Sequence, residues 1–211
     1  MLRARVLMPA LAILLLAGCS SEPSKPASTA AQAKPAAKPP ESLTAREAFQ
    51  KLYATARQWA SDARPVRLES QPIAGADGRD GKAMIWRAAF ASPGKRGIKG
   101  FTWSGAAGPD APERGITHGS EDTWSPTNAS TQPFDFQFLK NDSDAAFAVA
   151  QKHGGEKATK ADPKLPVMYL LDWDARDNQL VWHVIYGSSR TEAKLTVDVD
   201  ASSGEFLRVE K

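Results

Sequence analysis

The stretch LTVDVDASSGEFLRV, residues 195–209, decides the fold at the C-terminal end of this 211-residue chain. Polar and apolar residues alternate in its first part, and Ser203-Gly204 supplies a turn in which glycine readily adopts a positive φ angle. The pattern predicts a hairpin of two antiparallel strands, 194–200 and 205–209. Its inward side is expected to carry Leu195, Val197 and Val199, and its outward side Thr196, Asp198 and Asp200.

The residues before this hairpin add a helix and two strands. Apolar runs at 167–173 and 180–186 are typical of paired strands, with the polar loop 174–178 between them. Further upstream, Asp142 is placed to cap a helix over 143–153, and the glycine pair 154–155 is placed to end it. The sequence therefore predicts a helix packed on an antiparallel sheet.

This order of elements is similar to that of a known module. The helix with Ala146-Phe147 and Ala150, the strand LVWHVIYG (180–187) and the hairpin VDVDASSGEFL (197–207) resemble a PepSY domain, whose closing hairpin carries a Val-Asp, small-residue, Gly-Glu pattern. The resemblance covers residues 139–211. PepSY domains are associated with peptidase propeptides and with envelope proteins that bind or restrain peptidases. The resemblance implies no catalytic residue in this chain.

The first half repeats this order loosely. The capping-box pattern Thr44-Ala45-Arg46-Glu47 predicts a helix with an apolar stripe that ends at Pro65. Strands are predicted at 66–70, 84–91 and 98–104, with a hairpin connection at 92–97. The alternating segment 134–138 predicts a further strand with three phenylalanines on one face. We expect an α+β fold of antiparallel sheet with packed helices, in two PepSY-like units: a divergent first unit, 44–138, and a second, 139–211.

The N-terminus ends an apolar run with Leu16-Ala17-Gly18-Cys19. Arg3 and Arg5 precede that run, which at about eleven residues is too short to span a bilayer. The segment resembles the lipobox of bacterial lipoproteins. The resemblance implies a signal peptide over 1–18, cleavage after Gly18, and acylation of Cys19 by palmitate-type chains that hold the protein on a membrane. An uncleaved signal anchor and a non-lipidated secretory signal are the alternatives.

Residues 19–43 follow as a spacer of proline, alanine, serine and lysine. This composition buries too little apolar surface to fold and favours extended polyproline II. Ser20 stands where aspartate would favour retention in the inner membrane of enteric bacteria. We therefore expect a lipid-anchored protein of the bacterial cell envelope, on the outer membrane and facing the periplasm.

Charge and cysteine content exclude several classes of function. The formal charge of +3 falls to +1 once Arg3 and Arg5 leave with the signal, and no block of basic residues occurs, so nucleic acid is not an expected partner. Cys19 is the chain's single cysteine, which rules out disulfides and cysteine-metal sites in the folded part. No nucleophile elbow, phosphate loop or His-Glu-x-x-His motif is present, and no cofactor is expected.

The nearest approach to a metal or general-base cluster is His118 with Glu121 and Asp122, to which the distant His183 could add a ligand. A solvated strand or loop is the alternative. Trp103, Trp124, Trp173 and Trp182 are candidate anchors for a partner, with core packing as the alternative.

The leading hypothesis is a non-enzymatic envelope lipoprotein whose PepSY-like domain binds a protein or peptide, with a peptidase-modulating role implied by the resemblance. The partner-binding residues are not identified by the sequence. A structural or assembly lipoprotein of the outer membrane is the second hypothesis, and a metal-binding or enzymatic envelope protein is the third.

Overall fold

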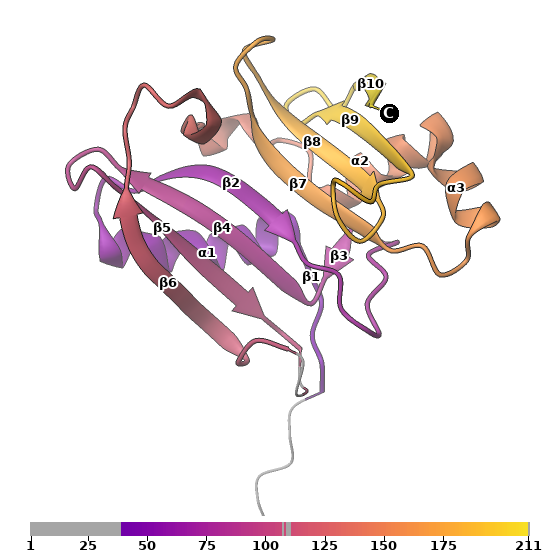
Figure 1. Cartoon of the computed structure of the whole chain (residues 1–211), viewed down its shortest axis with the longest axis horizontal. Helices are drawn as coiled ribbons and strands as arrows, with labels where there is room; N and C mark the ends of the chain where they lie inside the picture. The colour runs from indigo at the N-terminus through magenta and orange to yellow at the C-terminus, as the bar shows by residue number, and fades with distance from the viewer. Residues whose placement is uncertain (1–38, 107, 109–110, 211) are drawn as a thin grey trace, which may run out of the picture. The chain divides into compact units, whose positions relative to one another are not determined.

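The computed structural model describes residues 39–106, 108 and 111–210 (Figure 1). The predicted signal peptide 1–18, Gly18, Cys19 and most of the spacer 19–43 lie outside the described residues. Within them, no helix is both long and apolar enough to cross a bilayer.

An eight-stranded antiparallel sheet forms the centre of the fold, in the order β10-β9-β8-β7-β2-β4-β5-β6. Its strands are β2 (Arg64–Ser70), β4 (Ile85–Ser92), β5 (Gly97–Ser104), β6 (Gly115–Thr123), β7 (Val167–Asp174), β8 (Gln179–Tyr186), β9 (Leu195–Asp200) and β10 (Phe206–Glu210). A separate short ladder pairs β1 (Leu43–Thr44) with β3 (Lys82–Ala83). The predicted α+β class, with antiparallel sheet and packed helices, is confirmed.

The helices α1 (Ala45–Trp59), α2 (Ser143–Ala150) and α3 (Glu156–Ala161) accompany this sheet. Figure 1 looks onto one face of the sheet, with α1 and α2 behind the strands. The main apolar core joins Phe49 and Leu52 of α1, Ala146 of α2, and the inward residues of the strands, among them Leu68 and Leu171. A second, smaller cluster joins Val66, Ala91 and Trp124. Both halves of the chain therefore contribute to the main core. The opposite face, which we call the helix-free face, carries no α-helix from the described part of the chain (Figure 1).

The structure of the first half agrees closely with the sequence-based predictions. Thr44 caps α1 as the capping box predicts: its hydroxyl accepts from the backbone N–H of Glu47, and the Glu47 carboxylate accepts from the backbone N–H of Thr44. The helix ends at Trp59, before the predicted stop at Pro65, which instead lies inside β2 next to a bulge. The β4–β5 hairpin forms as predicted, with Arg96 of its turn at φ 51°.

The predicted strand over 134–138 is wrong. Asp135 accepts a hydrogen bond from the backbone N–H of Gln137 and caps a 3-10 turn over Phe136–Phe138. A turn of three residues per revolution sends the rings in different directions, unlike an extended strand. Phe134 is buried, Phe136 stacks on Phe49, and Phe138 contacts Trp173 while remaining 37% exposed.

The second half of the structure differs from the sequence-based predictions in two places. The helix expected over 143–153 ends at Ala150 and continues through a π turn, Gln151–Gly155, in which Gly154 adopts φ 113°, into α3. The glycine pair therefore bends the helical segment and does not end it. In β9, Asp198 faces the side opposite the core, as the alternation predicts, but its side chain is fully buried, because His183 and Arg208 cover it on the helix-free face.

The same topology occurs twice along the chain. α1 precedes the antiparallel meander β2-β4-β5-β6, and α2 with α3 precedes the meander β7-β8-β9-β10. The first strands of the two meanders, β2 and β7, pair antiparallel and fuse them into one sheet. The division into units at residues 138 and 139 stays a prediction, since every strand of both meanders belongs to a single sheet.

Candidate functional site

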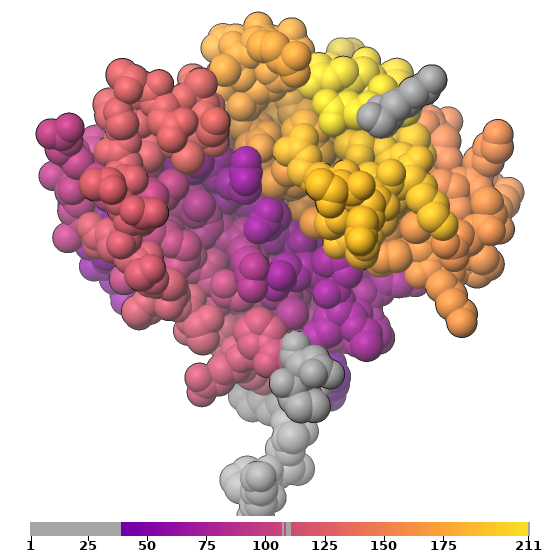
Figure 2. All heavy atoms as spheres, in the orientation of Figure 1, coloured from indigo at the N-terminus to yellow at the C-terminus, as the bar shows by residue number. Residues whose placement is uncertain are grey.

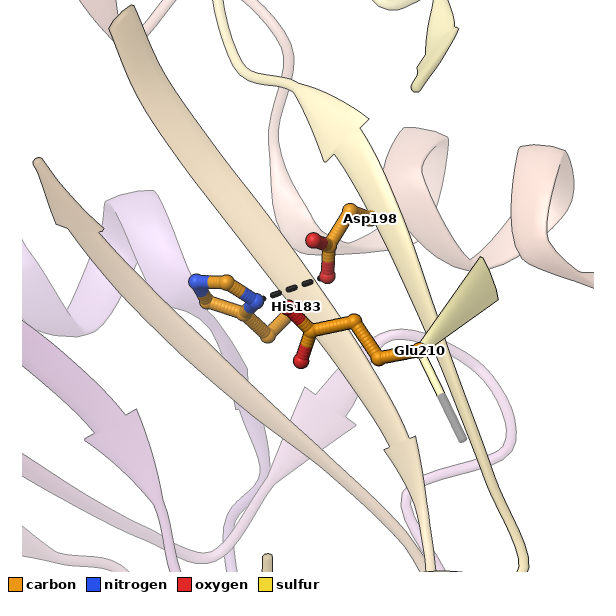
Figure 3. A group of neighbouring side chains, drawn as sticks. All are labelled: His183, Asp198 and Glu210. Atoms are coloured by element: carbon orange, nitrogen blue, oxygen red, sulfur yellow. Dashed lines mark hydrogen bonds and ion pairs between the residues drawn. The ribbon is translucent and has the colours of Figure 1, made fainter. Parts of the chain in front are cut away.

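A row of alternating charges crosses the helix-free face of the sheet. Its centre is His183 of β8, whose neighbours along the chain, Trp182 and Val184, face the core. The imidazole Nδ1–H donates to Asp198 Oδ1 at 2.7 Å, and Nε2–H donates to Asp172 Oδ1 at 3.1 Å. Figure 3 shows the contact with Asp198 and the carboxylate of Glu210 beside it. The ring is therefore held between carboxylates of both adjoining strands.

This environment keeps His183 charged. Burial of the ring opposes the charge, but the hydrogen bonds and negative charges of Asp172 and Asp198 outweigh it and raise the pKa of His183 to about 9. Burial likewise acts to raise the pKa of Asp172, and the hydrogen bond from His183 outweighs it, so that the pKa of this carboxyl lies below its usual range. Both groups are ionised at neutral pH.

Arginines extend the row on both sides. Beyond Asp198, Arg208 of β10 places its Nε 2.9 Å from Asp198 Oδ2 and donates from its other nitrogens to Asp174 at 2.9 Å and Asp177 at 3.0 Å. Beyond Asp172, Arg67 of β2 donates to Asp172 Oδ2 at 3.3 Å. The row thus runs over five adjacent strands and crosses the junction between the two meanders.

The chemistry available to His183 follows from its two protons. His183, Asp198 and Glu210 place one ligand atom each within 4.8 Å of one another, a spacing that could surround a metal ion. A histidine binds a metal or accepts a proton only through a free nitrogen lone pair, and at neutral pH both nitrogens of His183 carry hydrogens bonded to carboxylates. The guanidinium of Arg208 already supplies positive charge to Asp198. The arrangement favours a buried ion-pair network over a metal or proton-transfer site.

The cluster predicted from the sequence is not brought together. His118, Glu121 and Asp122 lie exposed on β6, at one end of the sheet, whereas His183 lies on β8, five strand positions away. Glu121 accepts a hydrogen bond from the indole N–H of Trp59 at 2.8 Å, and Asp122 accepts from the backbone N–H of Thr123. These contacts are those of a solvated edge strand, which is the alternative given by the sequence.

The tryptophans proposed as anchors do not form an exposed patch. Trp103, Trp124 and Trp182 are buried, and Trp173 is half-buried against Phe138. His153, distant from the other histidines in sequence, stacks on Phe206 with ring centroids 3.8 Å apart.

Two depressions open on the helix-free face. One, of about 180 Å³, lies over β2, β4 and β5 and is lined by Arg67, Glu69, Arg87, Ala89 and Thr102, among others. The second, of about 240 Å³, is lined by the charged row and its rim: Asp172, Trp173, Asp174, Ala175, Arg176, His183, Arg190, Arg208 and Glu210. The Arg67–Asp172 ion pair connects the two. Figure 2 shows this face hollowed between the segment after β6 and the loop before β9.

Sequence reasoning singled out His183 but missed its partners. A charged residue within the apolar run 180–186 requires a counter-charge when it is buried. Each flanking strand offers acids on the side that His183 faces: Asp172 and Asp174 in β7, and Asp198 and Asp200 in β9. The alternation in β9 predicts the outward side of Asp198 but not the strand and side chains that cover it. The pattern could have identified the network once the strand registers were considered together.

Comparison with known proteins gives one structural neighbour to report. No protein-family model matches the chain, and no curated protein matches it. The fold is similar to a crystal structure of CD1622, named as a "putative lipoprotein" of Clostridium difficile 630, with a TM-score of 0.51 and 12% sequence identity, over 77% of this chain and 91% of that one. At this identity the similarity shows a shared fold.

Proposed function

We propose that this protein is a membrane-anchored lipoprotein of the cell envelope, without enzymatic activity, that binds a protein or peptide partner on the helix-free face of its sheet. The observation that carries the proposal is the asymmetry of the sheet. Helices cover one face and fill the main core, while the other face carries no α-helix among the described residues, is hollowed over both meanders, and bears ordered charges. A second packed layer normally covers such a face unless it meets solvent or a partner.

The anchor is the second part of the proposal. Lipid on Cys19 would hold the folded domain at the end of the spacer 19–43, on the outer membrane and facing the periplasm. The name of the structural neighbour, a "putative lipoprotein", agrees with this proposal. The repeated order of helix and four-stranded meander agrees with two PepSY-like units, and a peptidase is then the partner class to test first.

Site-specific photo-crosslinking in the living cell tests the binding face. A photoreactive residue at Thr102, in the depression over β4 and β5, is expected to capture a reproducible partner, whereas the same residue at Gln58, exposed on α1, is expected to capture none. Equal capture from both positions, or none from Thr102, would overturn the proposal. A deletion strain distinguishes partner binding from the structural alternative. Loss of an assembly lipoprotein is expected to make the cell sensitive to detergent, whereas loss of a peptidase modulator is expected to alter proteolysis.

Fractionation tests the anchor. The wild-type chain is expected in the membrane fraction after a high-salt wash, and Cys19→Ala is expected in the soluble fraction. Retention of Cys19→Ala in the membrane would contradict lipid anchoring and favour an uncleaved signal anchor.

A further inference from the structure

The charged side chains around the second depression differ in their exposure to solvent. The carboxylates at its base are the least exposed: side-chain exposure is 0% for Asp198, 10% for Asp174 and 21% for Asp172. Two arginines at the rim are more exposed, at 51% for the Arg190 side chain and 84% for that of Arg176, while Arg208 and Glu210 are intermediate at 33% and 35%. A group that enters this depression from solvent therefore meets Arg176 and Arg190 before it meets Asp172, Asp174 or Asp198.

The two rim arginines have donors available. Arg176 reaches Asp174 Oδ1 only at 3.8 Å, and Arg190 reaches Glu210 Oε2 only at 3.9 Å, both longer than a hydrogen bond. Arg208, in contrast, uses its guanidinium on Asp174, Asp177 and Asp198. Arg176 and Arg190 both line the 240 Å³ depression, so both guanidinium groups can contact a ligand held in it.

We propose that this depression receives an aspartate or glutamate side chain from an acidic segment of the protein partner, bound by Arg176 and Arg190. The inference rests on the proposed binding function and specifies the chemistry of the partner. Guanidinium groups match a carboxylate in bidentate geometry, and such charge-assisted hydrogen bonds are the stronger kind. The site suits isolated carboxylates and not a dense polyanion, because Asp177 and Glu210 stand beside the arginines.

A lipid surface is the other anionic ligand to consider, and the shape of the site argues against it. A bilayer presents many phosphates in a plane, which would place several negative charges over Asp177 and Glu210 as well as over the arginines. A single side chain that projects from a protein can enter the depression and avoid these acids. Vesicles therefore serve as a competing probe in the test.

The test uses the folded, unlipidated chain from residue 20 onward with two peptides, acetyl-(Ser-Glu)3-amide and acetyl-(Ser-Lys)3-amide. In NMR titrations at low salt, the acidic peptide is expected to shift the Nε–H signals of Arg176 and Arg190 saturably, and the basic peptide is not. Arg176→Gln and Arg190→Gln are each expected to weaken binding about tenfold, the order of one charge-assisted hydrogen bond. Arg57→Gln, on the exposed side of α1, is the matched control and is expected to bind as wild type.

Several outcomes would overturn the inference. These are absence of saturable shifts with the acidic peptide, equal binding by Arg176→Gln or Arg190→Gln, and binding to phosphatidylglycerol vesicles that depends on these arginines while the peptide does not bind. The crosslinking at Thr102 is independent of these results. A partner captured there without peptide binding would leave the proposed function standing and remove this inference. Peptide binding without a captured partner would contradict the proposed function, and with it the assignment of the carboxylate to a protein partner.

Discussion

His183 carries its charge inside the sheet because two carboxylates flank its imidazole. Removing one of them leaves positive charge buried with too few partners, which is among the most destabilising changes a protein can undergo. We expect Asp198→Asn to lower the free energy of unfolding by about 3–5 kcal/mol, since Asp198 is fully buried between His183 and Arg208. Urea denaturation followed by tryptophan fluorescence measures this change.

The matched control is Asp177→Asn, which removes a second carboxylate partner of Arg208 whose side chain is 52% exposed. Solvent screens this pair, so we expect a loss below about 1 kcal/mol. Similar losses for the two variants would contradict the network as a buried structural unit.

The same histidine predicts a pH dependence of stability. Its pKa is about 9 in the folded protein, compared with 6.5 as its ordinary value. Since the folded state holds the proton more tightly, the stabilisation is fully present below about pH 6.5 and is lost as the pH rises through about 9. The expected decrease is on the order of 3 kcal/mol, read from urea denaturation at pH 6 and pH 9.5. In His183→Gln this decrease should disappear, and its persistence would assign the effect to other groups.

At the scale of elements, the start of α1 is set by local hydrogen bonds. Thr44 and Glu47 satisfy each other's backbone N–H groups, and these donors have no partner within a helix. We expect Thr44→Ala to lower the free energy of unfolding by about 1 kcal/mol, measured by chemical denaturation. Thr55→Ala, in the middle of the same helix, serves as the control and should change stability by less than half as much.

Elements could be predicted where local chemistry and tertiary packing agree. The capping box at Thr44 and the hairpin at Ser203-Gly204 each specify their geometry within a few residues, and both are confirmed. Segment 134–138 has the alternation of a strand, but a local hydrogen bond from the backbone N–H of Gln137 to the Asp135 carboxylate favours a turn. Its three rings then contact different neighbours, which no local pattern reveals.

The candidate site was harder to predict for the same reason. Each residue of the charged row belongs to a different strand, so the network exists only once five strands are in register. Cross-strand registers are long-range properties that depend on the whole sheet. His183 could be predicted as a candidate, but it was grouped with His118. The two residues lie far apart, because β8 and β6 are not neighbours in the sheet.

At the scale of the molecule, the pairing of β2 with β7 determines how the two meanders behave. Leu68 and Leu171 face each other across this junction, both are fully buried, and the core on their side takes residues from α1 and α2 alike. A core shared in this way couples the halves, because neither meander can unfold without exposing the other's apolar face. Arg67 and Asp172 couple them on the opposite face as well.

We therefore expect a single cooperative unfolding transition for the described domain. Leu171→Ala should lower the free energy of unfolding by about 2–5 kcal/mol. The decrease should be the same whether it is measured in the first meander or in the second. Amide hydrogen exchange measures this, since protection in β4 and β5 and protection in β8 and β9 should fall together by the same free energy. Loss of protection confined to β7, β8, β9 and β10 would show that the two meanders are independent units joined at one strand pair, and the helix-free face would then have to be considered as two separate surfaces.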